Sequence, residues 1–287
     1  MIFGKGLVRT PNDFGVQGQL PSHPELLDWL AISFSENWDV KALLKKMVLS
    51  KTYQQHSVSN ELLDQKDPNN FLLARANSSQ LPAEIIRDNA LKVSGLLNPK
   101  VGGESVQPYQ PKGLWKEKNN FSTFLLEYEE SEGEDLYRRG LYTFIRRTSP
   151  PPNMVTFDAT SREICTVKRD ITSTPLQALV LLNDPQFFEA SRVFAERMIK
   201  SKDTLEEQIS HGFRLATARH PKEEELNILV DLFNSQYQFF RQNRDKAYQV
   251  ISVGQKPRDT DIYSVKTAAM TMVANTLLNH NETYTKR

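Results

Sequence analysis

Five side chains of this sequence have the chemistry of an acid–base site for a sugar substrate: Asp13, His23, Asp158, Arg162 and Glu163. Carboxyl groups about 5–9 Å apart across a cleft are typical of glycoside hydrolysis, in which one group acts as an acid and the other as a base or nucleophile. One hypothesis is therefore an enzyme that gathers these residues in one pocket and acts on a complex or sulfated carbohydrate. Carboxylates that are each paired with an arginine away from any cleft would instead indicate a structural role.

The segment 138–170 concentrates positive charge, with seven basic against three acidic side chains, in a chain whose net charge is +1. Guanidinium groups bind carboxylate, sulfate or phosphate through paired N–H donors. The candidates for an anion- or ligand-binding site are Arg146, Arg147, Arg162 and Arg169. The alternative is structural: the arginines hydrogen-bond loop carbonyls, or they pair with the six acids of 127–135. The sequence favours the structural interpretation.

Other kinds of site lack a signature. None of the five histidines stands in a zinc- or haem-attachment motif, and neither a phosphate-binding glycine loop nor a nucleophile elbow occurs. We therefore predict no metal site and no cofactor in this chain. The single cysteine, Cys165, excludes an internal disulfide, and we expect it to be small, partly buried and not catalytic.

Composition limits the partners. Basic and acidic side chains are nearly balanced, 36 against 35, which is not the basic excess typical of nucleic-acid binding. No run of apolar residues reaches the roughly 18 needed to cross a membrane. We expect neither a nucleic acid partner nor a membrane span.

Caps and apolar periodicity predict a mainly α-helical fold: an irregular multi-helix bundle with a long loop-rich middle and at most a short strand pair. Ser22 and Glu25 indicate a capping box. Asp39 precedes an amphipathic helix, and Thr174-Pro175 starts another. Further helices are expected at 82–97, 204–218, 221–241, 244–252 and 260–279, and an extended segment at 141–145. We predict one helical domain over 1–287, with helical sub-regions 1–97 and 174–287 and an irregular, basic sub-region 98–173.

Several blocks of this chain resemble a known family. They include Gly-Lys-Gly-Leu-Val-Arg-Thr-Pro-Asn-Asp-Phe-Gly at 4–15, Ser-His-Pro-Glu-Leu-Leu-Asp-Trp-Leu at 22–30 and Tyr-Arg-Arg-Gly-Leu-Tyr at 137–142. The strongest is Arg-Thr-Ser-Pro-Pro-Pro at 147–152, followed by Phe-Asp-Ala at 157–159 and Thr-Pro-Leu-Gln-Ala-Leu at 174–179. From residue 1 to about residue 280, the chain resembles the C-terminal domain of unknown function of planctomycete-type cytochrome c multidomain proteins, the PSD-type domain.

The resemblance implies an extracytoplasmic bacterial protein, in the periplasm or at the cell surface. It also implies that a haem-binding domain and a second domain precede this one, and that the chain is truncated at its N-terminus. Members of the family often occur in settings suggestive of complex-carbohydrate breakdown. Haem is expected only in the upstream domain. The leading hypothesis is a non-haem helical module that docks against the upstream domains or binds a polymeric glycan. The alternatives are the carbohydrate-acting enzyme described above and a purely structural spacer.

Overall fold

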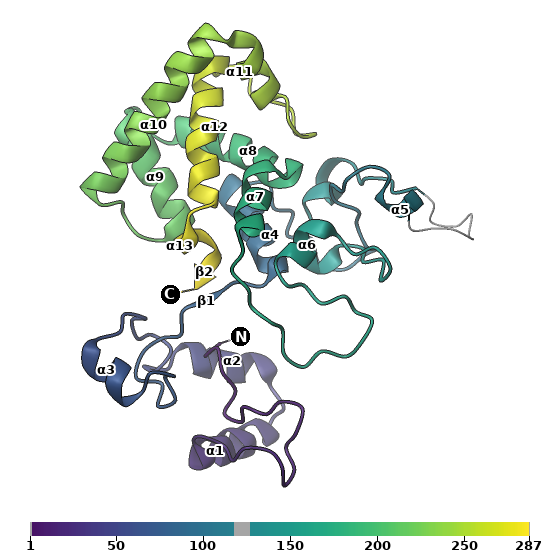
Figure 1. Ribbon diagram of the computed structural model, residues 1–287, viewed down its shortest axis with the longest axis vertical. Coiled ribbons are helices and arrows are strands. Elements are labelled where there is room, and N and C mark those ends of the chain that lie inside the picture. The colour runs from purple at the N-terminus through teal and green to yellow at the C-terminus, as the bar shows by residue number, and fades with distance from the viewer. Residues whose placement is uncertain (1, 118–126, 287) are drawn as a thin grey trace. The chain divides into compact units, whose positions relative to one another are not determined.

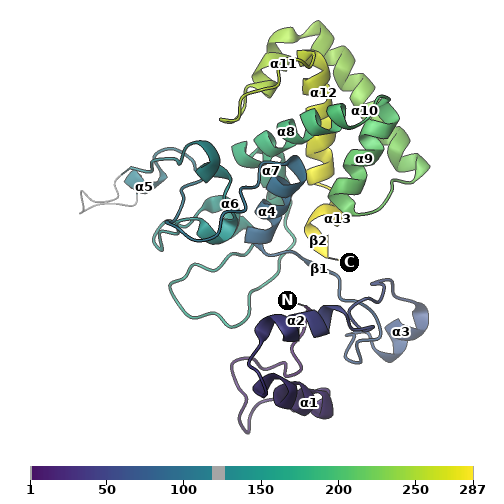
Figure 2. The same ribbon diagram turned by 180° about the vertical axis from the view of Figure 1, so that it is seen from behind.

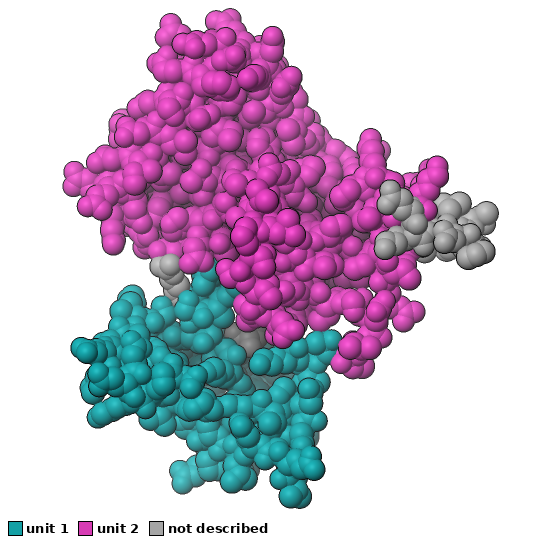
Figure 3. Space-filling model, viewed as in Figure 1, with its two compact units in different colours: residues 1–80, 166–168, 285–287 teal, residues 81–165, 169–284 magenta. Residues whose placement is uncertain are grey.

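The computed structural model of the protein describes residues 2–117 and 127–286. Within these residues it contains thirteen α-helices, two short 3₁₀ helices and one two-stranded antiparallel sheet, so the predicted mainly α-helical fold is confirmed (Figure 1). The chain divides into two compact units (Figure 3). Unit 1 comprises residues 1–80, 166–168 and 285–287, and unit 2 comprises residues 81–165 and 169–284. That the chain folds as one domain with three sub-regions stays a prediction.

Unit 1 contains three short helices and the two-stranded sheet (Figures 1 and 2). Its elements are α1 (Pro24–Ser35), α2 (Val40–Val48), α3 (Glu61–Lys66), β1 (Ser79–Gln80) and β2 (Thr285–Lys286). β1 and β2 run antiparallel, with Ser79 opposite Lys286. No apolar side chain of residues 2–80 is buried, and the buried side chains of this segment are those of Asp67 and Asn70. Unit 1 therefore has no hydrophobic core of the usual kind.

Of the two helix caps predicted in unit 1, one is confirmed and the other is wrong. Oδ1 of Asp39 accepts a hydrogen bond from the N–H of Ala42 at 2.9 Å, so the predicted cap of α2 is confirmed. The capping box predicted at Ser22 and Glu25 is wrong, because His23 occupies the N-cap position of α1 and makes no side-chain capping bond. The hydroxyl of Ser22 lies 2.9 Å from Nδ1 of His23 instead.

Unit 2 is an assembly of helices with an irregular segment between α4 and α7. Its elements are α4 (Ala83–Ser94), α5 (Leu114–Glu117), η1 (Gly133–Tyr137), η2 (Gly140–Tyr142), α6 (Pro152–Thr156), α7 (Pro175–Asn183), α8 (Pro185–Ser201), α9 (Leu205–Thr217), α10 (Glu223–Gln242), α11 (Arg244–Ile251), α12 (Ser264–Leu278) and α13 (Asn281–Tyr284). The predicted helices of this region are present, with ends shifted by up to four residues. Thr174 caps α7 as expected, and its N–H donates to Oε1 of Gln177 at 3.3 Å.

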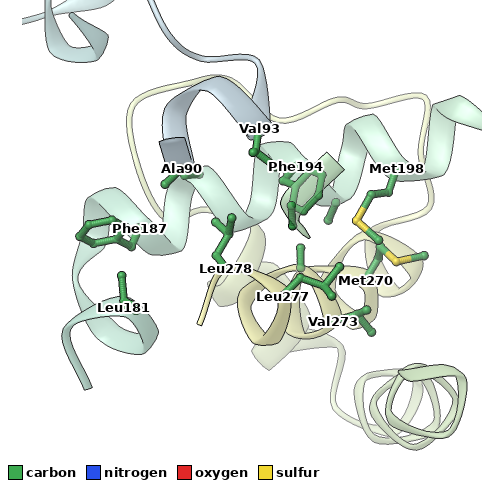
Figure 4. Close-up of a cluster of buried hydrophobic side chains, with 14 of the residues drawn as sticks. Ala90, Val93, Leu181, Phe187, Phe194, Met198, Met270, Val273, Leu277 and Leu278 are labelled. Atoms are coloured by element: carbon green, nitrogen blue, oxygen red, sulfur yellow. The ribbon is translucent and has the colours of Figure 1, made fainter. Parts of the chain in front are cut away.

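The core of unit 2 lies where α12 packs against α8 (Figure 4). Phe194 and Met198 of α8 and Met270 and Val273 of α12 have no exposed surface. Alanines at 190, 195, 268, 269 and 274 are equally buried, and their small side chains let the two helices approach closely. α9 also lies close to α8, because a Cβ on Gly212 would stand 2.5 Å from Cε of Met198.

The extended segment expected at 141–145 is largely wrong. Its first residues belong to the 3₁₀ helix η2, and only Thr143 forms a bridge, a parallel one to Val106. The backbone turns here because Gly140 is held against α4: its N–H donates to Oδ1 of Asp88 at 2.6 Å, and a Cβ on it would lie 3.1 Å from Cα of Glu84. The strand pair of the chain is β1 with β2.

A fully buried carboxylate on α8 binds the loop between α11 and α12. Oε1 of Glu189 accepts hydrogen bonds from the N–H of Lys256 at 2.7 Å and the hydroxyl of Tyr137 at 2.9 Å, and Oε2 accepts one from the hydroxyl of Tyr109 at 3.0 Å. Gly254 crosses directly over this group, with φ +91°. A Cβ there would lie 2.2 Å from the carboxyl carbon of Glu189, so the site requires glycine.

We predict that Gly254→Ala destabilises the protein by about 1–3 kcal/mol more than Gly95→Ala, because the added methyl group overpacks a buried site. Gly95 is the matched control: its φ is also +91°, and nothing lies within 4 Å of its missing Cβ. Both substitutions carry the same backbone strain, and only the first meets a side chain. Urea unfolding of the two variants measures the difference, and equal losses of stability would contradict the described contact.

Candidate functional site

The two N-terminal candidates for acid–base chemistry, Asp13 and His23, belong to unit 1 and make local bonds. Oδ1 of Asp13 accepts from the N–H of Gly15 at 2.9 Å, and the hydroxyl of Thr10 donates to the Asp13 carbonyl at 2.7 Å. The ring of His23 contacts the hydroxyl of Ser22 at the start of α1. These bonds are those of a turn and of a helix start.

Asp158, Arg162 and Glu163 belong to unit 2 and lie on one loop. Asp158, at φ +59°, accepts from the N–H of Thr172 at 2.7 Å and also from its hydroxyl, and this interaction closes the loop 158–172. Arg162 and Glu163 are exposed on the loop between these ends. The carboxylate of Asp158 is thus bound to threonine rather than to an arginine.

Arg169 forms a bidentate ion pair with Glu84 on α4, at 2.7 and 3.0 Å. Burial alone would raise the pKa of Glu84, but the hydrogen bonds from Arg169 outweigh burial and hold that pKa below its usual range. The same bonds raise the pKa of Arg169. Arg169 is thereby joined to a carboxylate, the arrangement that indicates a structural role.

Arg146 and Arg147 lie in the turn that leads into the proline run 150–152. The guanidinium of Arg146 lies 5.2 Å from the ring centroid of Trp115, and its Nε donates to the hydroxyl of Thr148 at 3.1 Å. Arg147 is exposed. Trp115 is buried and also contacts Tyr128 and Phe144, so Arg146 covers one side of an aromatic cluster.

Two buried arginines bind backbone carbonyls of the irregular segment. Arg87 of α4 donates to the carbonyls of Leu136, at 2.9 Å, and Arg138, and its burial lowers its pKa to about 10. Arg138 donates to the carbonyls of Glu104, at 3.0 Å, and Gly102. Arg138 thus makes the bonds to loop carbonyls that the structural interpretation of the basic segment expects. Among the described residues, no ion pair joins these arginines to the acids of 127–135.

One exposed apolar surface of unit 1 was not foreseen as a site. α2 presents Val40, Leu44 and Val48 at four-residue spacing, with exposed fractions of 57%, 45% and 38%. α1 adds Trp29, which is 53% exposed. The two helices lie side by side, because Lys46 of α2 donates to the hydroxyl of Ser33 and lies 4.6 Å from the Trp29 ring. Lys46 projects from the side of α2 opposite to Leu44, so Trp29 does not extend this row. We call Val40, Leu44 and Val48 the α2 apolar surface.

The sequence contained part of the signal for this surface. The spacing of Val40, Leu44 and Val48 predicted an amphipathic helix, and that prediction is confirmed. A periodic pattern does not indicate whether the partner of an apolar face lies in the same chain, and in this structure the three side chains are exposed.

Three further observations concern kinds of site. No helix in the described ranges has both the length and the apolar character needed to cross a membrane. No group of three or more His, Cys, Asp or Glu side chains in residues 2–117 and 127–286 is arranged to hold a metal ion. The expectation that Cys165 is partly buried is wrong: it is exposed, and it lies in the loop closed by Asp158 and Thr172.

Comparison with known proteins gives one match. A family model described as "PSD1: Protein of unknown function (DUF1553)" matches residues 1–233. No curated protein and no solved structure matches the sequence.

We predict that Arg169 and Glu84 are coupled by about 0.5–1 kcal/mol at neutral pH, as befits a half-exposed pair. A double-mutant cycle with Arg169→Gln and Glu84→Gln, read by urea unfolding, measures this coupling. Because the pKa of Glu84 is depressed in the folded protein, the contribution is complete above the usual carboxyl pKa of about 4.3 and disappears as the pH falls below it. Arg147→Gln is the control, since Arg147 is exposed. Additive effects at pH 7 would exclude the pair as a stabilising contact.

Proposed function

The chain belongs to the PSD1 family of proteins of unknown function (DUF1553), and we propose that it acts as a docking module. It is the non-haem helical part of a planctomycete-type, cytochrome c-linked multidomain protein of the periplasm or cell surface, and it packs against the upstream domains of the same polypeptide. The observation that carries this proposal is the α2 apolar surface, whose three side chains are 38–57% exposed.

The energetics of unit 1 support a partner. Burying a Val, Leu or Trp side chain stabilises a structure by about 1.5–3 kcal/mol, and residues 2–80 bury none completely. α1 has 12 residues and α2 has 9, and isolated helices of about 12–15 residues or fewer are marginally stable in water. A surface that covers Val40, Leu44 and Val48 would supply the missing free energy.

The chemistry of the surface favours a protein partner over a glycan. Val40, Leu44 and Val48 are aliphatic and offer no hydrogen-bonding groups, whereas a polymeric sugar presents hydroxyls that need donors and acceptors. The row of side chains four residues apart matches a helix packing against an apolar groove or helix. The upstream domains implied by the family resemblance are covalently tethered, so their effective concentration at this surface is high.

The candidate acid–base residues support the docking proposal less directly. Asp13, His23 and Asp158 make local hydrogen bonds that keep turns and a loop in shape, and Arg169 is bound to Glu84. These contacts support a structural role for each of the four side chains. A carbohydrate-acting enzyme is the alternative hypothesis. It requires that substitution of these residues changes the turnover of a carbohydrate substrate.

We predict that Leu44→Glu undocks α2 in the full-length polypeptide that carries the upstream domains. In the docked protein, trypsin reaches α2 slowly at Lys41, Lys45 and Lys46, because cleavage requires the helix to detach and open. A buried glutamate opposes docking, so we expect cleavage at these lysines to become at least about tenfold faster, equivalent to 1.4 kcal/mol. Peptide mapping over time measures the rates.

Two controls separate docking from a loss of folding. Ile228→Glu places the same charge on α10, where Ile228 is 67% exposed, and should leave cleavage of α2 unchanged. Leu44→Glu in the 287-residue chain alone should have little effect, since Leu44 is already exposed there. Equal cleavage of α2 with and without the substitution in the full-length polypeptide would exclude this docking surface and favour the structural-spacer alternative.

A further inference from the structure

Unit 2 contains a shallow pocket that shares no lining residue with the candidate sites described above. It lies beside the C-terminal end of α4, between α8, α9 and the loop that precedes α12, and has a volume of about 430 Å³. That volume lies within the range of small-molecule sites, about 300–1,000 Å³. Its charged lining consists of Glu196, Arg197, Lys200, His211 and Asp259.

The two carboxylates of the pocket already have partners. Oε1 of Glu196 accepts from Nη1 of the fully buried Arg192 at 2.8 Å and from the N–H of Asp259 at 3.3 Å. The carboxylate of Asp259 pairs with Lys200. These bonds give both acids a cationic partner, although Arg192 also lies 3.9 Å from Glu189, and they fix the loop wall of the pocket.

Two cationic or donor groups of the pocket have no carboxylate partner among the described residues. Arg197 uses Nη1 to donate to the carbonyl of Val93 at 2.7 Å, and that bond holds its guanidinium at the end of α4. Nε and Nη2 of Arg197 form no hydrogen bond with residues 2–117 or 127–286. The ring of His211 likewise has no hydrogen-bond partner in those ranges.

The electrostatic surroundings of His211 are positive. Burial lowers the pKa of its imidazole, and the charges of Arg197, Lys202 and Arg214 lower it further. The carboxylates that face it across the pocket, Glu196 and Asp259, are the ones held by Arg192 and Lys200. Three positively charged side chains thus lie near an imidazole that has no hydrogen-bond partner among the described residues.

We infer that this pocket binds the oxyanion group of a small ligand, with Arg197 as the charged donor and His211 as a second donor. A guanidinium presents two N–H groups in the geometry that sulfate, phosphate and carboxylate accept. Here Nε and Nη2 form that pair, because the opposite edge of the guanidinium is bound to Val93. The inference is independent of the docking proposal, since it uses no residue of unit 1.

The test is a titration of the 287-residue chain with sodium sulfate, inorganic phosphate and acetate at constant ionic strength, followed by the NMR signals of His211. We expect saturable binding of at least one of the three anions, and their order distinguishes tetrahedral from planar oxyanions. An anion favours the protonated imidazole, so binding should raise the pKa of His211, and affinity should increase as the pH falls from 8 towards 5.5.

Variants assign the site. Arg197→Gln should weaken binding at least about tenfold, the effect of losing a charged hydrogen bond. Arg197 also supports the end of α4, so His211→Gln serves as a second variant. Calorimetry of this variant should show weaker anion binding that no longer depends on pH. Arg241→Gln, at the end of α10, should change nothing. Linear, unsaturated shifts of His211, or equal effects of all three variants, would overturn the inference and indicate general ionic screening.

Discussion

The packing of α12 against α8 is the contact on which the rest of unit 2 depends. α8 carries Phe194 and Met198 on the side that meets α12, and the same helix carries Glu189 and Arg192 towards the irregular segment and the loop before α12. Apolar burial supplies most of the free energy of such a core, and it fixes α8 rigidly. A rigid α8 can then position charged side chains that would be costly to bury on a mobile element.

Irregular backbone is stable in unit 2 because buried side chains satisfy its polar groups. Arg87 and Arg138 donate to carbonyls between 100 and 138, while Glu189 accepts a backbone N–H and two tyrosine hydroxyls. Each such charge is costly to remove from water, and it is retained because its hydrogen bonds replace those of the solvent. The arginine-rich sequence therefore has a structural explanation at Arg138, without requiring a ligand there.

Local patterns predicted the helices well and the interactions between distant segments poorly. The cap at Asp39, the start at Thr174 and the helices of the C-terminal third follow from short-range chemistry, and they are found. Ser22 is an exception: its hydroxyl was expected to cap the helix, but it hydrogen-bonds the neighbouring imidazole of His23 instead. The bidentate bond from Arg169 to Glu84 and the pocket around His211 join residues far apart in sequence, and one sequence contains no signal for their proximity. The sequence likewise contains no signal for the proposed docking partner of α2.

We propose that α1 and α2 pack against a surface outside this chain. Amide hydrogen exchange of the two helices, compared between the 287-residue chain and the full-length polypeptide, tests it most directly, because exchange reports the free energy of local opening. If α2 docks on such a surface, its amides exchange at least about tenfold more slowly in the full-length polypeptide, and the amides of α8 and α12 are unchanged. Equal exchange of α2 in both proteins would contradict it.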